Sequence, residues 1–306
     1  MGDPRPIGFF DSGVGGLTVL REVIRRLPAE DTLYLGDNAR TPYGPRPDDE
    51  VVRFSTECLD ELAGRDVKAI VVACNTSTAV ALPQLRRRYA LPILGVVRPG
   101  ATAAALATRT RAVGVIATAA TVRSHAYFEA ISEEDPFVQV YEQATPELVP
   151  LVEAGRLRGP DVDAAIRRSL APLLGRQVAE DQASGRDHPS FVFPMDEEAR
   201  IDTLLLGCTH YPLLGPAIRA IVGDAIAVID SASATASALA SLIEVHALGA
   251  PHAGPGRHLM LTTGDVEAFR QTASRLFGED LGSVAGVSLG VSRRPAAAPA
   301  MVGEGT

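Results

Sequence analysis

Two stretches of the sequence are apolar strands of the same kind, and each ends in a cysteine followed by polar residues. They are KAIVVACNT, from Lys68 to Thr76, and IDTLLLGCTH, from Ile201 to His210. Continuous runs of Val, Ile and Leu are typical of strands that are buried on both faces of a parallel sheet. Because ligands bind at the carboxyl ends of such strands, we expect Cys74 and Cys208 to flank one substrate.

Strand and helix patterns alternate along the chain, which predicts an α/β fold. We expect strands at 6–10, 32–37, 69–73, 91–97, 112–118, 138–141, 201–207, 225–231 and 258–263. The sequence Arg98-Pro99-Gly100 indicates a break before an Ala-rich helix at 101–108, and the chain is expected to enter a second domain there. The polar stretch 176–200 is expected to be an exposed loop, and the Pro/Ala/Gly-rich end, 293–306, to be disordered.

Length and charge limit the class of protein. The 306 residues suffice for two domains of ordinary size, and 46% of them are hydrophobic. A net charge of -8 argues against nucleic acid as the main partner. No apolar run is long enough to span a membrane, and the first residues lack the apolar segment of a secretory signal. We therefore expect a cytoplasmic protein with no membrane partner.

The residues also argue against the usual cofactors. Lys68 is the only lysine of the chain and precedes the strand that ends at Cys74, so it is expected far from the thiol, where it could not serve pyridoxal phosphate. Cys208 and His210 alone form a weak metal motif, because zinc needs about four ligands. The Gly-rich turn at 11–16 lacks the third glycine of a dinucleotide fingerprint. We expect no cofactor and no metal.

Two thiols on opposite sides of a pocket suit one reaction in particular. Inversion of an amino acid at its α-carbon requires a base on one face and an acid on the other. A free cysteine has a pKa of about 8.5, so each thiolate needs help from its surroundings. His210 is expected to assist Cys208, and Asp11, at the tip of the first strand, to assist Cys74. Helix N-termini after Asn75 and Thr209 would favour a thiolate and a substrate carboxylate.

The loop at 38–45 follows the second strand and is punctuated by proline and glycine. It is either an ordinary turn with a surface tyrosine or a rigid wall of the site. In the second interpretation, the Tyr43 hydroxyl and backbone amides bind a substrate carboxylate. Cys58, in contrast, shares a helical face with Val51, Phe54 and Leu62, which predicts a core residue.

Motifs spread over most of the chain resemble the aspartate/glutamate racemase family, and within it the glutamate racemases. The motifs are FDSGVGGLTV at 10–19, GDNARTPYG at 36–44, ACNT at 73–76, GVVRPGA at 95–101, LVPLVE at 148–153, LGCTHYP at 206–212 and LTTG at 261–264. The sequence departs from the family at Thr145-Pro146, where Cys-Pro is frequent, and at Asn38-Ala39-Arg40. Neither departure includes a thiol, so the expected activity is unaffected.

The resemblance implies a cofactor-independent racemisation of glutamate that supplies D-glutamate for bacterial peptidoglycan. It implies that Cys74 is the base for the D-enantiomer and Cys208 the base for the L-enantiomer, assisted by Asp11 and His210. The implied substrate-binding residues are Asp11, Ser12, Pro42, Tyr43, Gly44, Asn75, Thr76, Thr118, Thr121, Glu153, Thr209 and His210.

The resemblance also implies two doubly wound, pseudo-symmetric domains with mostly parallel sheets and the site in the crevice between them. The first domain would contain 1–98 and 211–292, and the second 99–210. A homodimer is compatible with the family, but the residues do not determine the oligomeric state.

Three alternatives stay open at this point. One is a related racemase acting on aspartate or another amino acid. Another is a non-catalytic amino-acid-binding protein, which would need neither thiol. The third is that both cysteines are simply buried strand residues, although the polar residues that follow each of them argue against it.

Overall fold

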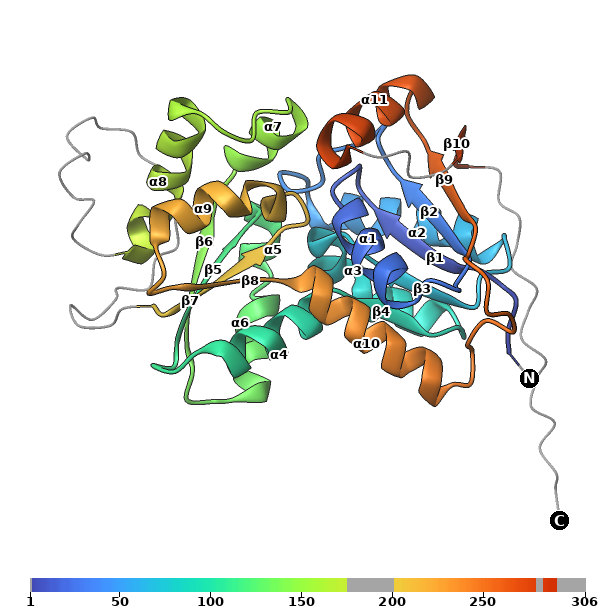
Figure 1. The fold of residues 1–306 in the computed structure, drawn as a ribbon, viewed down its shortest axis with the longest axis horizontal. Coiled ribbons are helices and arrows are strands. Elements are labelled where there is room, and N and C mark those ends of the chain that lie inside the picture. The colour runs from blue at the N-terminus through green and yellow to red at the C-terminus, as the bar shows by residue number, and fades with distance from the viewer. Residues whose placement is uncertain (1, 175–200, 279–282, 291–306) are drawn as a thin grey trace, which may run out of the picture.

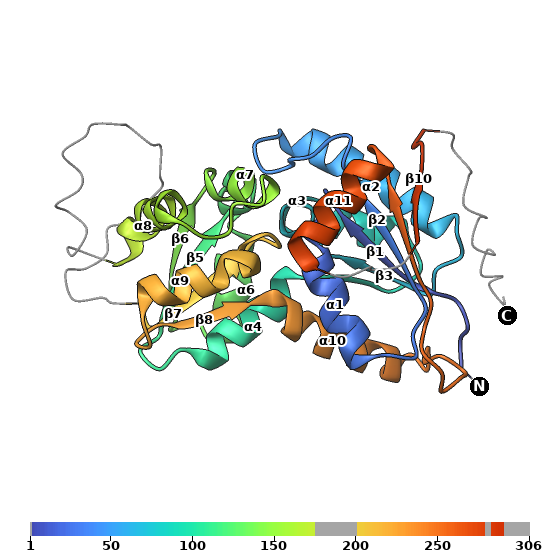
Figure 2. The ribbon, with the colours of Figure 1, turned by 45° about the horizontal axis from the view of Figure 1, so that its top comes forward.

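The computed structural model describes residues 2–174, 201–278 and 283–290. Within them the chain forms two parallel sheets, which lie side by side in Figures 1 and 2. The predicted α/β class and the parallel sheets are confirmed. The expected loop at 176–200 and the expected tail at 293–306 lie outside the described residues.

The first sheet has the order β10-β9-β2-β1-β3-β4. Its strands are β1 (Ile7–Asp11), β2 (Thr32–Gly36), β3 (Ala69–Val72), β4 (Ile93–Gly95), β9 (His258–Thr262) and β10 (Ser283–Gly286). Every residue of β1, β2 and β3 is buried. These central strands carry apolar residues without alternation because helices cover both faces of the sheet.

The second sheet has the order β6-β5-β7-β8. Its strands are β5 (Ala112–Ala117), β6 (Gln139–Ala144), β7 (Thr203–Gly207) and β8 (Ala227–Asp230). The inner strands β5 and β7 are buried throughout, whereas the edge strands are only partly buried.

Twelve helices, one of them a 3₁₀ turn, accompany these strands in the described residues. They are α1 (Leu17–Arg26), α2 (Asp48–Ala63), α3 (Asn75–Arg88), α4 (Val97–Ala107), α5 (Ala119–Arg123), α6 (Ala126–Glu134), α7 (Leu148–Glu153), α8 (Pro160–Leu174), η2 (Tyr211–Leu214), α9 (Gly215–Val222), α10 (Ser231–Val245) and α11 (Val266–Phe277). Helix α10 packs against α1 beside the first sheet and against α4 beside the second, and so joins the two halves (Figure 1). None of the described helices is long and apolar enough to cross a membrane.

The predicted break at Arg98-Pro99-Gly100 is wrong. These residues form the first turn of α4, which begins at Val97, and β4 is correspondingly shorter than expected. Proline is tolerated in the first turn of a helix, since the backbone N–H that it lacks would have no partner there. Helix α4 then packs against β7 of the second sheet, so the chain does change sheets near the expected position.

The expected return to the first sheet after residue 210 is too early. Strand β8 pairs in parallel with β7, with Leu205 opposite Ile229. The segment from η2 to β8 therefore belongs to the second sheet, and the chain returns only after Asp230. Neither α11 nor β10 was expected from the sequence. Strand β10 has only four residues, and none of them is fully buried.

Lys68 lies at the amino end of β3, away from the thiol that follows the same strand. Its Nζ is 2.5 Å from Glu30 Oε2 and donates to the Asp3 carbonyl at 2.9 Å. The side chain is almost completely buried. Lys68 thus joins the N-terminal segment to the base of the first sheet and takes no part in the site.

Candidate active site

A cavity of about 210 Å³ lies between the carboxyl ends of the two sheets. It is lined by Ser12, Thr41, Pro42, Tyr43, Gly44, Pro45, Cys74, Asn75, Thr76, Thr118, Ala119, Thr145, Pro146, Val149, Pro150, Glu153, Cys208, Thr209, His210 and Tyr211. Both thiols contribute to this one cavity, Cys74 from the end of β3 and Cys208 from the end of β7. The two similar strand endings therefore meet in space.

Cys74 is the N-cap of α3. Its Sγ accepts a hydrogen bond from the Ser77 backbone N–H at 3.4 Å and lies 3.6 Å from Ser12 Oγ. Burial and then the nearby Asp11 carboxylate raise the pKa of the Cys74 thiol to about 11, against the opposing effect of its hydrogen bonds. This group accordingly holds its proton at neutral pH and can donate it.

Cys208 has a different neighbour. Its Sγ lies 3.7 Å from Nδ1 of His210. Burial tends to lower the pKa of His210, but the contacts with Cys208 and Glu153 outweigh it and raise this pKa to about 10. The imidazole is thereby held next to the sulfur, where it can exchange protons with it.

Glu153 connects the two halves of the site. Its Oε1 lies 3.5 Å from His210 Nε2 and accepts a hydrogen bond from Thr41 Oγ1 at 3.4 Å. His210 follows a strand of the second sheet, whereas Thr41 lies in the loop after β2 of the first. The carboxylate also fixes the orientation of the imidazole that faces Cys208.

Asp11 and Thr121 are predicted to contact the substrate, but neither lines the cavity. Asp11 is fully buried behind Ser12, and its Oδ2 accepts from the Gly13 N–H at 2.9 Å. Burial raises the pKa of the Asp11 carboxyl, although the His210 charge opposes this effect. Thr121 lies behind Thr118, with their hydroxyl oxygens 3.0 Å apart. Both residues act on the cavity from behind its wall.

Asn75 and Thr76 supply polar groups at the N-terminus of α3. The Asn75 Oδ1 accepts a hydrogen bond from the Tyr127 hydroxyl at 2.5 Å, while its Nδ2 has no partner among the described residues. The Thr76 hydroxyl lies 2.9 Å from that of Thr118 on the other sheet. An unpartnered amide donor and a helix N-terminus together suit a carboxylate ligand.

The loop from Thr41 to Pro45, called the substrate loop below, lines the cavity, but one expectation for it is wrong. The Tyr43 hydroxyl donates a short hydrogen bond to Asp37 Oδ2, so its proton is not available to a substrate. All five residues of the loop still line the cavity. The Gly44 carbonyl accepts from the Ala120 N–H at 3.1 Å, and a Cβ on Gly44 would lie 2.8 Å from Thr118 Cβ. Only glycine permits this approach of the two halves.

Eight residues that line the cavity were not predicted from the sequence. The additional lining residues are Thr41, Pro45, Ala119, Thr145, Pro146, Val149, Pro150 and Tyr211. Several of them adjoin predicted residues or lie in the motifs that carry the resemblance, and this position could have indicated that they line the site. Thr145 and Tyr211 are far apart in sequence, and their hydroxyl oxygens lie 2.7 Å apart, which no local pattern predicts.

No group of three or more His, Cys, Asp or Glu side chains in the described residues could hold a metal ion. Residues 7–180 match the model of a family described as Asp/Glu/hydantoin racemase. The chain belongs to this family of racemases, whose members include enzymes acting on amino acids.

Within the family, the chain is similar to glutamate racemases. It is 42% identical to that of Shouchella clausii over 285 residues, which are 93% of this chain and 95% of the relative. It resembles the crystal structure of glutamate racemase isoform RacE1 from Bacillus anthracis, with a TM-score of 0.82, 38% identity and coverage of 93% and 98%. It also resembles glutamate racemase from Francisella tularensis in complex with D-glutamate, with a TM-score of 0.79, 30% identity and coverage of 94% and 98%.

Proposed function

We propose that this chain interconverts L- and D-glutamate, with Cys74 and Cys208 as its two bases. The observation that carries the proposal is the position of the two thiols, which come from different sheets and line one cavity. The similarity to glutamate racemases over more than nine-tenths of the chain supports glutamate as the substrate.

The proposed reaction moves two protons. In the L-to-D direction, the Cys208 thiolate removes the α-proton, so that a C–H bond breaks and an S–H bond forms. The resulting carbanion takes a proton from the Cys74 thiol on its other face, which leaves a Cys74 thiolate. The D-to-L direction is the reverse. No atom or electron is gained or lost overall, and each turnover exchanges the protonation states of the two thiols.

The surrounding groups suit this assignment. His210 lies beside Cys208 and can exchange protons with it, whereas the Asp11 carboxyl, behind Ser12, favours the protonated form of Cys74. Positioned acid–base groups of this kind are typically worth about 10²–10⁴-fold in rate. Asn75, Thr76, Thr118 and the substrate loop would hold the two carboxylates of glutamate.

The family resemblance extends the proposal to the role of the product. D-Glutamate made in the cytoplasm would supply peptidoglycan synthesis. We expect no cofactor, because the only lysine is remote from the cavity and the two thiols supply both proton transfers. A homodimer stays a prediction, and light scattering of the purified protein would test it.

Circular dichroism of glutamate solutions tests the activity directly. Purified enzyme without added cofactor should bring L-glutamate and D-glutamate to the same racemic end point, and should act much less on aspartate. A preference for aspartate would assign the related activity instead. Activity that a chelator abolishes and zinc restores would contradict the cofactor-independent mechanism. Binding of glutamate without α-proton exchange in heavy water would indicate a non-catalytic binding protein.

A further inference from the structure

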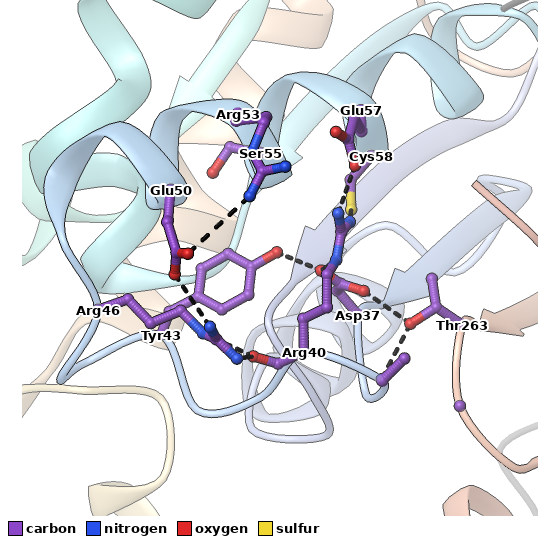
Figure 3. Close-up of polar contacts among 12 residues, drawn as sticks. Asp37, Arg40, Tyr43, Arg46, Glu50, Arg53, Ser55, Glu57, Cys58 and Thr263 are labelled. Atoms are coloured by element: carbon purple, nitrogen blue, oxygen red, sulfur yellow. Dashed lines mark hydrogen bonds and ion pairs between the residues drawn. The ribbon is translucent and has the colours of Figure 1, made fainter. Parts of the chain in front are cut away.

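A polar cluster adjoins the substrate loop and includes its Tyr43 (Figure 3). At its centre is Asp37, which follows β2 and is completely buried. Its Oδ2 accepts hydrogen bonds from Arg40 Nε at 2.7 Å and from the Tyr43 hydroxyl, and its Oδ1 accepts one from Thr263 Oγ1 at 2.7 Å. A buried carboxylate is stable only with such partners, and Arg40 is the cation among them.

Arg40 also connects the loop to α2. Its guanidinium makes an ion pair with Glu57, and another of its nitrogens lies 3.7 Å from Cys58 Sγ. The same group stacks over the Phe54 ring with its carbon 4.1 Å from the ring centroid. Three separate contacts with α2 hold the guanidinium in place. The guanidinium in turn holds Asp37 Oδ2, the oxygen that accepts the hydrogen bond from Tyr43.

The far end of the loop is closed by a second arginine. The Arg46 side chain donates to the Arg40 carbonyl through Nε at 3.0 Å and through a terminal nitrogen at 2.7 Å. Between the two arginines, the Tyr43 ring packs against Phe10 and Phe54, with centroids 6.3 and 5.7 Å apart. The loop is thus held at both ends and by its central side chain.

We propose that Arg40 is a positioning residue that sets the affinity for glutamate by holding Asp37 and Tyr43, and through them the substrate loop, against the cavity. The inference rests on the proposed function and deepens it, since Arg40 itself does not line the cavity. What it holds does line it: Tyr43 and Gly44 face the cavity directly.

Loss of the guanidinium leaves Asp37 buried without its cation, which weakens the anchor of Tyr43 and frees the loop. The substrate must then order the loop when it binds. Because the loop contacts substrate and transition state alike, the loss appears in KM and leaves kcat nearly unchanged. The loss of a hydrogen bond to a charged group corresponds to a rise in KM of about 10- to 100-fold. The rise must be equal for both enantiomers, since the equilibrium constant is fixed.

The experiment compares Arg40→Met with Arg53→Met. Arg53 stacks over the same Phe54 ring at 4.7 Å but pairs only distantly with Glu50, at 4.0 Å, and touches neither Asp37 nor the loop. Arg40→Met should raise KM for both enantiomers, and Arg53→Met should leave kcat and KM at wild-type values. Arg40→Lys should recover most of the affinity, because it restores the charge. Tyr43→Phe, which removes one hydroxyl, should raise KM in the same manner and serves if Arg40→Met does not fold.

The outcomes separate the two proposals. A wild-type protein that does not racemise glutamate contradicts the proposed function. An active wild type with equal kinetics in Arg40→Met and Arg53→Met overturns the role of Arg40. A loss confined to kcat in Arg40→Met and Tyr43→Phe also overturns it, because a positioning residue for the bound substrate would act on KM.

Discussion

The two walls of the cavity are similar in sequence and opposite in charge. On the first wall, Cys74 caps a helix of 14 residues, and the charge that raises its pKa is that of the buried Asp11 carboxyl. On the second wall, Cys208 precedes a short 3₁₀ turn, and its partner is the imidazole of His210. An anionic neighbour favours a thiol and a cationic neighbour favours a thiolate. The two thiols therefore have assisting groups of opposite charge.

Substitution of the assisting groups His210 and Asp11 should give the largest change in turnover that tests this comparison. His210→Asn should lower turnover by about 10²–10⁴-fold, with the larger loss in the L-to-D direction. Asp11→Asn should show the opposite bias. The fixed equilibrium constant requires each directional loss in kcat to be matched in KM. Progress curves from each pure enantiomer measure all four constants, and equal losses in both directions for both variants would contradict the division of roles.

The same contrast predicts a pH dependence of stability. The pKa of His210 is raised from 6.5 to about 10, so between these values the folded protein holds a proton that the unfolded chain has lost. This contribution to stability is complete below pH 6.5 and is lost as the pH rises toward 10. The slope cannot exceed about 1.4 kcal/mol per pH unit for one group.

Urea denaturation measures this slope in wild type and in His210→Asn. The range from pH 6.5 to 9 isolates His210, because the pKa of Cys74 is raised from 9.0 to about 11 and affects stability only above that range. The wild-type free energy of unfolding should fall across the range, and that of the variant should fall less. Parallel curves would mean that His210 is not protonated in the native protein.

The smallest effect concerns the contact between the walls. Gly15 precedes α1, and a Cβ there would lie 2.5 Å from Thr209 Oγ1 and 2.7 Å from His210 Nδ1. Gly15→Ala should therefore displace the second wall at a cost of about 1–3 kcal/mol. Gly249→Ala is the matched control, because its Cβ would meet nothing within 4 Å. Chemical denaturation of both variants is the measurement, and similar stabilities would refute the close contact.

The sequence predicted the features that depend on local pattern. An apolar strand that ends in Cys-Asn-Thr or Cys-Thr-His reaches the carboxyl edge of its sheet wherever the sheet lies, so both thiols were placed correctly in the cavity. The errors depend on distant neighbours. The Tyr43 hydroxyl bonds to Asp37, which is held beside it by Arg40 and by Thr263, a residue remote in sequence.

The other misplaced features have the same cause. Asp11 does not line the cavity, and it packs against Gly16, where an added Cβ would lie 2.6 Å from Asp11 Cβ. The boundary after residue 210 was misplaced because β8 is identified as part of the second sheet only by its pairing with β7. The contact of Thr145 with Tyr211 likewise exists only in the folded chain.

The most direct test of the central claim, that each thiol serves one face of the substrate, is α-proton exchange of single enantiomers in heavy water. Cys74→Ser should chiefly impair exchange from D-glutamate, so that in this variant L-glutamate exchanges faster than D-glutamate. Cys208→Ser should do the reverse. Nuclear magnetic resonance of the α-proton, recorded before racemisation proceeds, gives both rates for each variant. Equal residual exchange of both enantiomers in both variants would contradict the account, because it would mean that the two thiols do not face opposite sides of the substrate.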